Sequence, residues 1–290
     1  MTASEKVVRP ALRWHGGKWL LGPWVIEHLP PHRIYVEPFG GAASVLLRKP
    51  RAYAEVYNDL DDDVVNLFSV LRDPSTAHAL TDALRLTPFA RKEFRLSYEL
   101  TGDPIEKARR LVIRSFMGFG SDAPNRNVRA GFRAAGNRAG NTSAHDWMNY
   151  PESLAAVVAR LRGVVIECKP AMEVIQHQDQ QDAVFYLDPP YLPETRSNKS
   201  RRGKLKYHAY RHEMTADDHE LLLAEIQGLQ GMVVLSGYHS KLYDKYLKRW
   251  TRSERKALAD GAQPRVEVLW LNPAAHAALE QGRQQMRMAL

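Results

Sequence analysis

The stretch AVFYLDPPY, residues 183–191, is a compact apolar run that ends in an acid, two prolines and an aromatic residue. Five consecutive apolar residues are typical of a central strand in a parallel sheet, where both faces are covered. Pro189 and Pro190 end the strand and stiffen the turn that follows it. Because ligands of open α/β sheets bind at the carboxyl edge of the strands, the sequence predicts a binding site at this turn.

The same alternation of short apolar runs and amphipathic segments continues on both sides of this stretch. Further strands are predicted at 34–36, 54–57, 164–167 and 232–235, with a final hairpin near 250–256 and 265–271. Helices are predicted at 42–48, 62–71, 76–84, 88–98, 104–115, 153–161 and 215–229. Strands that alternate with helices indicate the α/β class, with a Rossmann-like parallel sheet covered by helices.

This alternation is lost between residues 73 and 163, where helical patterns follow one another and the segment 118–141 is rich in Gly, Asn and Arg. We therefore predict two domains. The first is a catalytic domain formed by residues 1–72 and 164–290. The second is a mostly helical domain inserted at residues 73–163.

Composition excludes several other classes of protein. The chain of 290 residues has one cysteine, Cys168, which excludes a disulfide framework and a multi-cysteine zinc site. Cys168 ends an apolar run and is expected to be buried. We see no apolar run as long as a membrane span and no signal peptide, so we expect a cytoplasmic protein. A monomer is the default expectation. The formal net charge of +8 favours phosphate-rich partners.

A turn of small residues follows the first predicted strand, in the order Glu37, Pro38, Phe39, Gly40, Gly41, Ala42. Such a turn lets a ligand approach the backbone closely and directs backbone amides into the crevice. Asp59 comes about 20 positions later, at the end of the second strand, where a carboxylate can accept hydrogen bonds from ribose hydroxyls. The two features together predict an adenosine-bearing ligand. Alternatively, Asp59 caps the helix that begins near Asp62.

The acid before the glycines distinguishes between two adenosine-bearing ligands. A pyrophosphate cofactor favours the full G-x-G-x-x-G pattern, and Glu37 would repel its charge. S-adenosylmethionine carries an ammonium and a sulfonium group, and both tolerate a carboxylate. The turn therefore favours S-adenosylmethionine.

The residue types of the turn after 183–187 suit one reaction in particular. An exocyclic amino nitrogen on a base is a poor nucleophile, because its lone pair is delocalised into the ring. The Asp188 carboxylate and the Pro189 carbonyl can each accept one amino hydrogen, which directs the lone pair at the methyl donor, and Tyr191 can stack on the base. Positioning and electrostatics then suffice, with no metal ion. A purely structural turn explains the prolines but not the flanking acid and aromatic residue.

These blocks resemble the Dam-like family of DNA adenine-N6 methyltransferases, with the motif order of the alpha group. The block at 13–18, RWHGGK, is similar to the family's N-terminal cofactor motif, which implies cofactor contacts for Trp14 and Lys18. Residues 37–44 resemble its glycine-containing cofactor loop, and Asp188, Pro189, Pro190 and Tyr191 form its D-P-P-Y catalytic motif. Asp59 falls at its ribose-binding acid, and Asp188 is also implied near the cofactor.

The resemblance implies a transfer from S-adenosyl-L-methionine to the N6 amino group of a flipped-out adenine, leaving S-adenosyl-L-homocysteine. Two departures from the family pattern stand out. The final glycine of the cofactor loop is Ala43 here. The segment 168–171 lacks the acid that contacts the cofactor adenine in many relatives.

Two basic segments are predicted to contact double-stranded DNA. The first lies in the inserted region and carries Arg126, Arg129, Arg133 and Arg138 among several Asn residues, which suits base edges and phosphates alike. The second follows the D-P-P-Y motif and carries Arg196, Lys199, Arg201 and Arg202. Between residues 193 and 212, seven Lys and Arg residues face one Glu, so we expect this segment to grip the strand around the flipped base. Flexible, solvated basic loops are the alternative for both.

Other functions remain open at this point. The same chemistry would serve a cytosine-N4 DNA methyltransferase or an adenine-N6 RNA methyltransferase. A non-catalytic DNA-binding protein that retains the fold is a different class, disfavoured by the intact motif. A nucleotide-dependent oxidoreductase is disfavoured by the absence of G-x-G-x-x-G.

Overall fold

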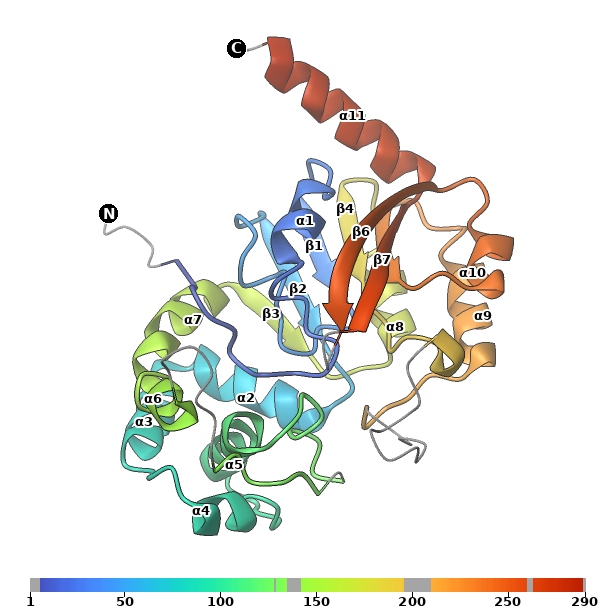
Figure 1. Ribbon diagram of the computed structural model, residues 1–290. Helices are drawn as coiled ribbons and strands as arrows, with labels where there is room; N and C mark the ends of the chain where they lie inside the picture. Colours follow the sequence, from blue (N-terminus) through green and yellow to red (C-terminus); the bar gives the residue numbers. More distant parts are fainter. Residues whose placement is uncertain (1–5, 128, 135–141, 196–209, 260–262, 289–290) are drawn as a thin grey trace.

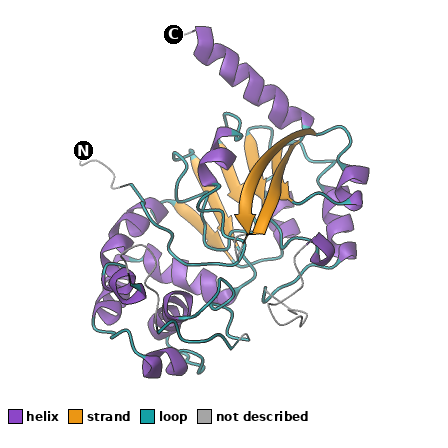
Figure 2. Ribbon diagram, in the orientation of Figure 1, coloured by secondary structure: helices purple, strands orange, loops and turns teal. Residues whose placement is uncertain are grey.

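A computed structural model describes residues 6–127, 129–134, 142–195, 210–259 and 263–288. Within these residues, one seven-stranded sheet forms the centre of the protein, in the order β3-β2-β1-β4-β5-β7-β6 (Figures 1 and 2). The strands are β1 (Ile34–Glu37), β2 (Ala54–Asn58), β3 (Val164–Glu167), β4 (Ala183–Leu187), β5 (Met232–Gly237), β6 (Thr251–Ala259) and β7 (Gln263–Leu271). The predicted α/β class and parallel sheet are confirmed.

The strand order places the site. β1 pairs in parallel with β2 on one side and with β4 on the other, so that Val36 lies beside both Val56 and Phe185. The chain therefore leaves β1 toward one edge of the sheet and returns to β4 toward the other. A crevice for ligands forms at the carboxyl ends of the strands where the order reverses in this way. The glycine turn after β1 and the D-P-P-Y turn after β4 meet at this crevice.

Two apolar layers cover the sheet, because alternate side chains of a strand point to opposite faces. On one face, Val36, Phe185 and Val233 pack in a cluster with residues of α8, α9 and α10. On the other face, Tyr35, Tyr186 and Val234 belong to a cluster that extends through α2 into the helices of the segment 74–161. Both faces being buried explains why β1, β4 and β5 are continuous apolar runs.

The helices are α1 (Gly22–Glu27), α2 (Asp62–Arg72), α3 (Pro74–Arg85), α4 (Arg91–Leu96), α5 (Pro104–Met117), α6 (Ser143–Met148), α7 (Leu154–Leu161), α8 (Ala171–His177), α9 (Ala216–Glu225), α10 (Lys241–Tyr246) and α11 (Pro273–Met288), with short 3-10 turns η1 (Pro151–Ser153) and η2 (Pro193–Thr195). α3 to α7 gather beside α2, away from the antiparallel edge of the sheet (Figure 1). They share one apolar cluster with the sheet face, and an independent domain at 73–163 stays a prediction.

Several local expectations were wrong. Residues 42–48 form turns rather than a helix, and α1, α6, α8, α10 and α11 were not predicted. Cys168 is exposed, because β3 is the outermost parallel strand and only Val164 of that strand is buried. The predicted hairpin is confirmed as β6 and β7, which pair antiparallel. In the described parts of the chain, no helix combines the length and the apolar character needed to cross a bilayer.

Candidate active site

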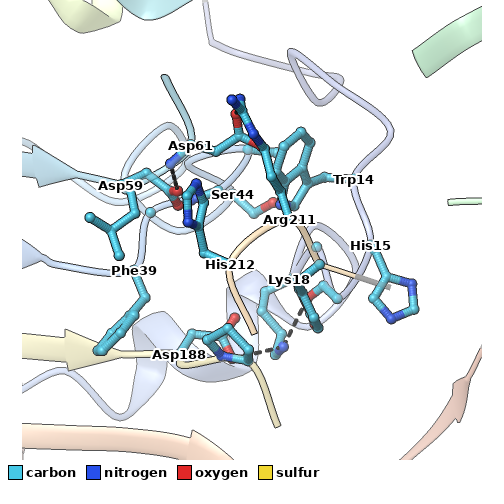
Figure 3. A pocket seen from close by; sticks show the side chains of 18 of the residues that line it. Trp14, His15, Lys18, Phe39, Ser44, Asp59, Asp61, Asp188, Arg211 and His212 are labelled. Carbon is cyan, nitrogen blue, oxygen red and sulfur yellow. Dashed lines mark hydrogen bonds and ion pairs between the residues drawn. The ribbon is translucent and has the colours of Figure 1, made fainter. Parts of the chain in front are cut away.

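A pocket lies over the carboxyl ends of β1, β2 and β4 and is shown in Figure 3. Its walls come from the N-terminal block, the glycine turn, the end of β2 and the D-P-P-Y turn. The predicted residues that line it are Trp14, Lys18, Glu37, Pro38, Phe39, Gly40, Gly41, Ala42, Asp59, Asp188 and Pro190. Four stretches that are separated in sequence therefore share one cavity.

Lys18 and Asp188 form a buried ion pair at the base of this pocket. The Lys18 ammonium lies 2.9 Å from Asp188 Oδ1 and also donates to the Gly16 carbonyl at 2.8 Å. Their side chains are 6% and 16% exposed, so little water screens the pair. Burial raises the pKa of Asp188, and the Lys18 charge opposes that shift. Lys18 thus favours an ionised carboxylate at the place where the sequence predicts the catalytic acid.

The remaining residues of the D-P-P-Y turn are held by the protein itself. Pro189 is buried, and the Pro190 carbonyl lies 2.9 Å from Nε2 of His219, a fully buried residue of α9. Tyr191 is 8% exposed, and its hydroxyl lies 2.7 Å from Glu267 Oε2 and 2.9 Å from Ser236 Oγ. The turn is therefore fixed from α9, β5 and β7 together. Stacking of Tyr191 on a base stays a prediction.

Glu37 is buried at the end of β1, where the Tyr35 hydroxyl (2.8 Å) and the Leu46 amide (3.0 Å) donate to its Oε2. Burial outweighs these bonds and raises the pKa of Glu37 to about 8. The ligand-free carboxyl therefore retains a proton at neutral pH. This weakens the argument that Glu37 repels pyrophosphate, while a cationic ligand would still favour its ionised form.

We expect this shifted pKa to appear in the stability of the ligand-free protein. Between the ordinary pKa of Glu37 near 4.5 and about 8, the folded chain keeps a proton that the unfolded chain has released. The free energy of unfolding therefore falls as pH rises through this window, by up to ~1.4 kcal/mol per pH unit from this group. Glu37→Gln stays neutral and should remove that part of the slope. Urea titrations of both proteins from pH 5 to 8 test this, and parallel curves would contradict it.

Asp59 ties the end of β2 to the glycine turn. Its Oδ2 accepts from the Gly41 amide at 2.7 Å and its Oδ1 accepts from the Asp61 amide at 2.8 Å. Asp61, not Asp59, caps α2, since Asp61 accepts from the Asp63 amide, so the capping alternative for Asp59 is wrong. Burial raises the pKa of Asp59 to about 6. Ribose binding by Asp59 stays a prediction.

The two glycines of the turn are required by their surroundings. A Cβ on Gly40 would lie 2.1 Å from the ring of Tyr57, which is fully buried and whose hydroxyl donates to the Gly41 carbonyl at 2.7 Å. Gly41 has φ +47 and packs against the Trp14 indole. Ala43, which replaces the family's final glycine, also adopts a left-handed φ of 53. These left-handed residues explain why the predicted helix at 42–48 does not form.

Gly40→Ala is expected to destabilise the protein by ~1–3 kcal/mol, because the Tyr57 ring cannot move without disturbing the core. It should also weaken ligand binding in the pocket, since the turn must shift away from β2. Thermal unfolding and binding calorimetry measure the two effects. The matched control is Gly102→Ala, where a Cβ would meet open space. If the two variants were equally stable, the close contact between residue 40 and the Tyr57 ring would not be the reason for a glycine at this position.

One wall of the pocket was not predicted as such. The segment 210–214 lines the pocket. The Tyr210 ring lies edge-on to His15, with centroids 4.9 Å apart. Arg211 Nη1 lies 2.9 Å from Asp61 Oδ1 and also pairs with Asp62. Figure 3 shows Arg211 and His212 beside Asp61 and Asp59. Residues 210–212 belong to the basic segment 193–212 that is predicted to grip DNA. In the structure, Tyr210 contacts His15 of the N-terminal block and Arg211 pairs with the start of α2, and DNA contact by this segment stays a prediction.

The predicted DNA-contacting residues are only partly described. Arg126 points toward Asp63, 4.0 Å away, and Arg129 is exposed with its guanidinium 4.6 Å from the centroid of the Tyr98 ring. Arg133 is half-buried, and its backbone amide donates to the Met117 carbonyl. Arg138, Arg196, Lys199, Arg201 and Arg202 lie outside the described residues. Ser121, Asp122, Pro124 and Asn125, from the same loop as Arg126, line the pocket.

The chain belongs to the D12 class of N6 adenine-specific DNA methyltransferases, whose family model matches residues 14–260. The match includes the N-terminal block, the glycine turn and the D-P-P-Y turn, and it confirms the resemblance drawn from these motifs.

Known relatives are named DNA adenine methylase. The chain is 27% identical over 196 residues to the protein of Vibrio cholerae serotype O1, covering 65% of this chain and 67% of the relative. It is 24% identical over 191 residues to that of Escherichia coli K12 (64% and 66%) and 22% identical over 223 residues to that of Salmonella typhi (75% and 76%). The similarity is low, and it covers about two thirds to three quarters of each chain.

Proposed function

We propose that the pocket binds S-adenosylmethionine and that the protein methylates N6 of an adenine flipped out of duplex DNA. One observation carries this proposal: the glycine turn after β1 and the Asp188 carboxylate after β4 line the same pocket. A cofactor held by the first is then within reach of an amine held by the second. Positioning of this kind is the main requirement of a reaction without a covalent enzyme intermediate.

The residues present fit this cofactor. A buried carboxyl at Glu37 and a net negative group around Lys18 suit a ligand with an ammonium and a sulfonium. The small residues of the turn allow close approach, and Asp59 lies at the end of β2 with free lone pairs for ribose hydroxyls. Phe39 and Leu60, which line the pocket, offer apolar surface for the cofactor adenine in place of the acid missing from 168–171. When bound, the cofactor supplies an electrophilic methyl group and leaves as S-adenosyl-L-homocysteine.

The chain's own part in the reaction is to orient the target amine. The Asp188 carboxylate and the Pro189 carbonyl each accept one amino hydrogen, so that the nitrogen lone pair is directed into the pocket. The Pro190 carbonyl does not compete, because it already interacts with His219. Because the electrons of the broken S–C bond would stay with the cofactor sulfur, the methylated nitrogen would have to lose one proton, and the Asp188 carboxylate that accepts an amino hydrogen would be placed to take it.

We infer that the basic segments bind the DNA backbone around the flipped base. Arg129 is exposed near the loop 121–125 that lines the pocket, so it can reach a phosphate while the base enters. We also propose DNA contacts for the other basic residues predicted from the sequence, which are Arg126, Arg133, Arg138, Arg196, Lys199, Arg201 and Arg202. A DNA substrate agrees with a cytoplasmic location, and a monomer remains the default.

The test is methyl transfer from radiolabelled S-adenosylmethionine to duplex DNA, followed by nucleoside analysis. We expect label in N6-methyladenine. Label in N4-methylcytosine alone, or in RNA alone, would replace the proposal with the related chemistry. Cofactor and DNA binding without any transfer would indicate a non-catalytic DNA-binding protein.

A further inference from the structure

Glu267 is a buried carboxylate in the active-site region to which neither the motifs nor the proposed reaction assigns a role. It lies on β7, is 6% exposed, and follows the family-matched segment, which ends at residue 260. A buried charge is costly unless it is paired and hydrogen-bonded. The groups that pair with the Glu267 carboxylate therefore indicate its role.

The Glu267 carboxylate interacts with the catalytic turn. The Tyr191 hydroxyl donates to its Oε2 at 2.7 Å, and Glu267 interacts electrostatically with Lys18, Asp188 and Tyr238. It thus reaches two of the four residues of the D-P-P-Y motif from a strand on the other side of β5.

The Tyr191 ring is enclosed on several sides. Ser236 Oγ of β5 lies 2.9 Å from the same hydroxyl, the Lys18 ammonium lies 4.7 Å from the ring centroid, and the Tyr238 ring meets it edge-on at 4.6 Å. The hydroxyl contacts fix the far end of the side chain, and the ring contacts limit its rotation. Tyr191 is therefore held in one orientation relative to Asp188.

We propose that Glu267 is a positioning residue for methyl transfer, which holds the Tyr191 side chain and with it the catalytic turn in the orientation that the reaction needs. This inference rests on the proposed function. Glu267 does not need to touch either substrate: it acts through Tyr191. Because reaction rates depend steeply on the placement of the reacting groups, a small displacement of the turn has a large effect.

Glu267 is also the third member of a charged group that contains Lys18 and Asp188. Lys18 carries one positive charge, and Asp188 and Glu267 together carry two negative charges when ionised. The pair of Lys18 and Asp188 alone is neutral, and Glu267 brings the group to one negative charge. Burial and this added charge raise the pKa of Asp188, and Lys18 opposes them. Glu267 therefore acts on the catalytic turn through its hydrogen bond to Tyr191, and the Lys18 charge compensates its own.

The experiment is a double-mutant cycle between Glu267→Ala and Tyr191→Phe, measured as single-turnover methyl transfer with saturating cofactor and DNA. We expect each single variant to slow transfer ~10–100-fold, and the double variant to be no slower than the slower single variant. Glu267→Gln, which keeps an acceptor for the Tyr191 hydroxyl, should recover most of the lost rate. The cofactor dissociation constant should change less than about threefold throughout.

The matched control is Glu254→Ala on the neighbouring strand β6, where the carboxylate is 43% exposed and pairs with Arg252. Its rate should equal that of the unmodified protein. Additive losses in the cycle, or a loss of cofactor affinity that accounts for the slower rate, would overturn the proposal. If Glu267→Ala fails to fold, Glu267→Gln and Tyr191→Phe still decide it, because a normal rate in Tyr191→Phe contradicts positioning through the hydroxyl.

A measurement without catalysis separates this inference from the proposed function. In protein labelled with 3-fluorotyrosine, the Tyr191 fluorine resonance is identified by its loss in Tyr191→Phe. Glu267→Ala should shift or broaden that resonance, and an unchanged resonance would refute the contact whatever reaction the protein performs. If the resonance changes and no DNA is methylated by any variant, the proposed function fails while the contact stands.

Discussion

Asp188→Asn is expected to lower the single-turnover rate of methyl transfer by on the order of 10²–10³-fold while the cofactor still binds. Asn has the same size as Asp but replaces one carboxylate oxygen with a donor, so a single uncharged oxygen must serve both the target amine hydrogen and Lys18. The effect should lie in the chemical step, because Glu37, Asp59 and the glycine turn remain intact. Rapid-quench kinetics and calorimetry measure the rate and the cofactor affinity separately.

The matched control for this prediction is Asp182→Asn. Asp182 precedes the same strand at its opposite end, is 48% exposed, and lies 3.9 Å from Arg33. Its replacement should leave the rate unchanged. Full activity in Asp188→Asn would remove the assigned role of the D-P-P-Y acid.

Lys18→Met is expected to reduce methyl transfer at neutral pH by ~10²-fold and to shift the pH–rate profile. Burial and Glu267 both raise the pKa of Asp188, and Lys18 opposes them. Without Lys18, Asp188 therefore stays protonated to higher pH. If the ionised carboxylate is the active form, the acidic limb of the profile must move to higher pH, and part of the lost rate should return as pH increases.

Initial rates between pH 5 and 9 test this, with Lys245→Met as the control. Lys245 is 65% exposed on α10 and pairs with Glu220, so its loss should not move the profile. An acidic limb that stays in place, or that moves to lower pH, would contradict the charge coupling between Lys18 and Asp188.

The parts of the site that could be predicted from sequence are those formed by short, rigid stretches. The D-P-P-Y turn could be placed because an apolar strand followed by two prolines has few alternatives, and the glycine turn because its acid and Asp59 have a recognisable spacing. Both stretches follow strands, so a parallel sheet necessarily brings their ends to one edge. The sheet topology then placed them in one pocket.

The rest depends on contacts between residues that no local pattern connects. Arg211 lines the pocket because it pairs with Asp61, about 150 positions earlier. Glu267 reaches the D-P-P-Y turn because β7 lies beside β5. A weak signal for Glu267 was present: a single acid between Val266 and Val268, in a stretch that is otherwise apolar from Val266 to Leu271. Cys168 was misjudged because sequence does not show which parallel strand is outermost.

The antiparallel edge of the sheet has a consequence for how much of the chain the enzyme needs. Every recognised motif lies before residue 260, yet the carboxylate beside the Tyr191 hydroxyl belongs to β7. A protein shortened at 260 would keep all its signature residues, lose this partner, and leave β5 with an open side. If Glu267 positions Tyr191 as we propose, β7 belongs to the catalytic apparatus, and a protein that lacks it should transfer methyl groups more slowly.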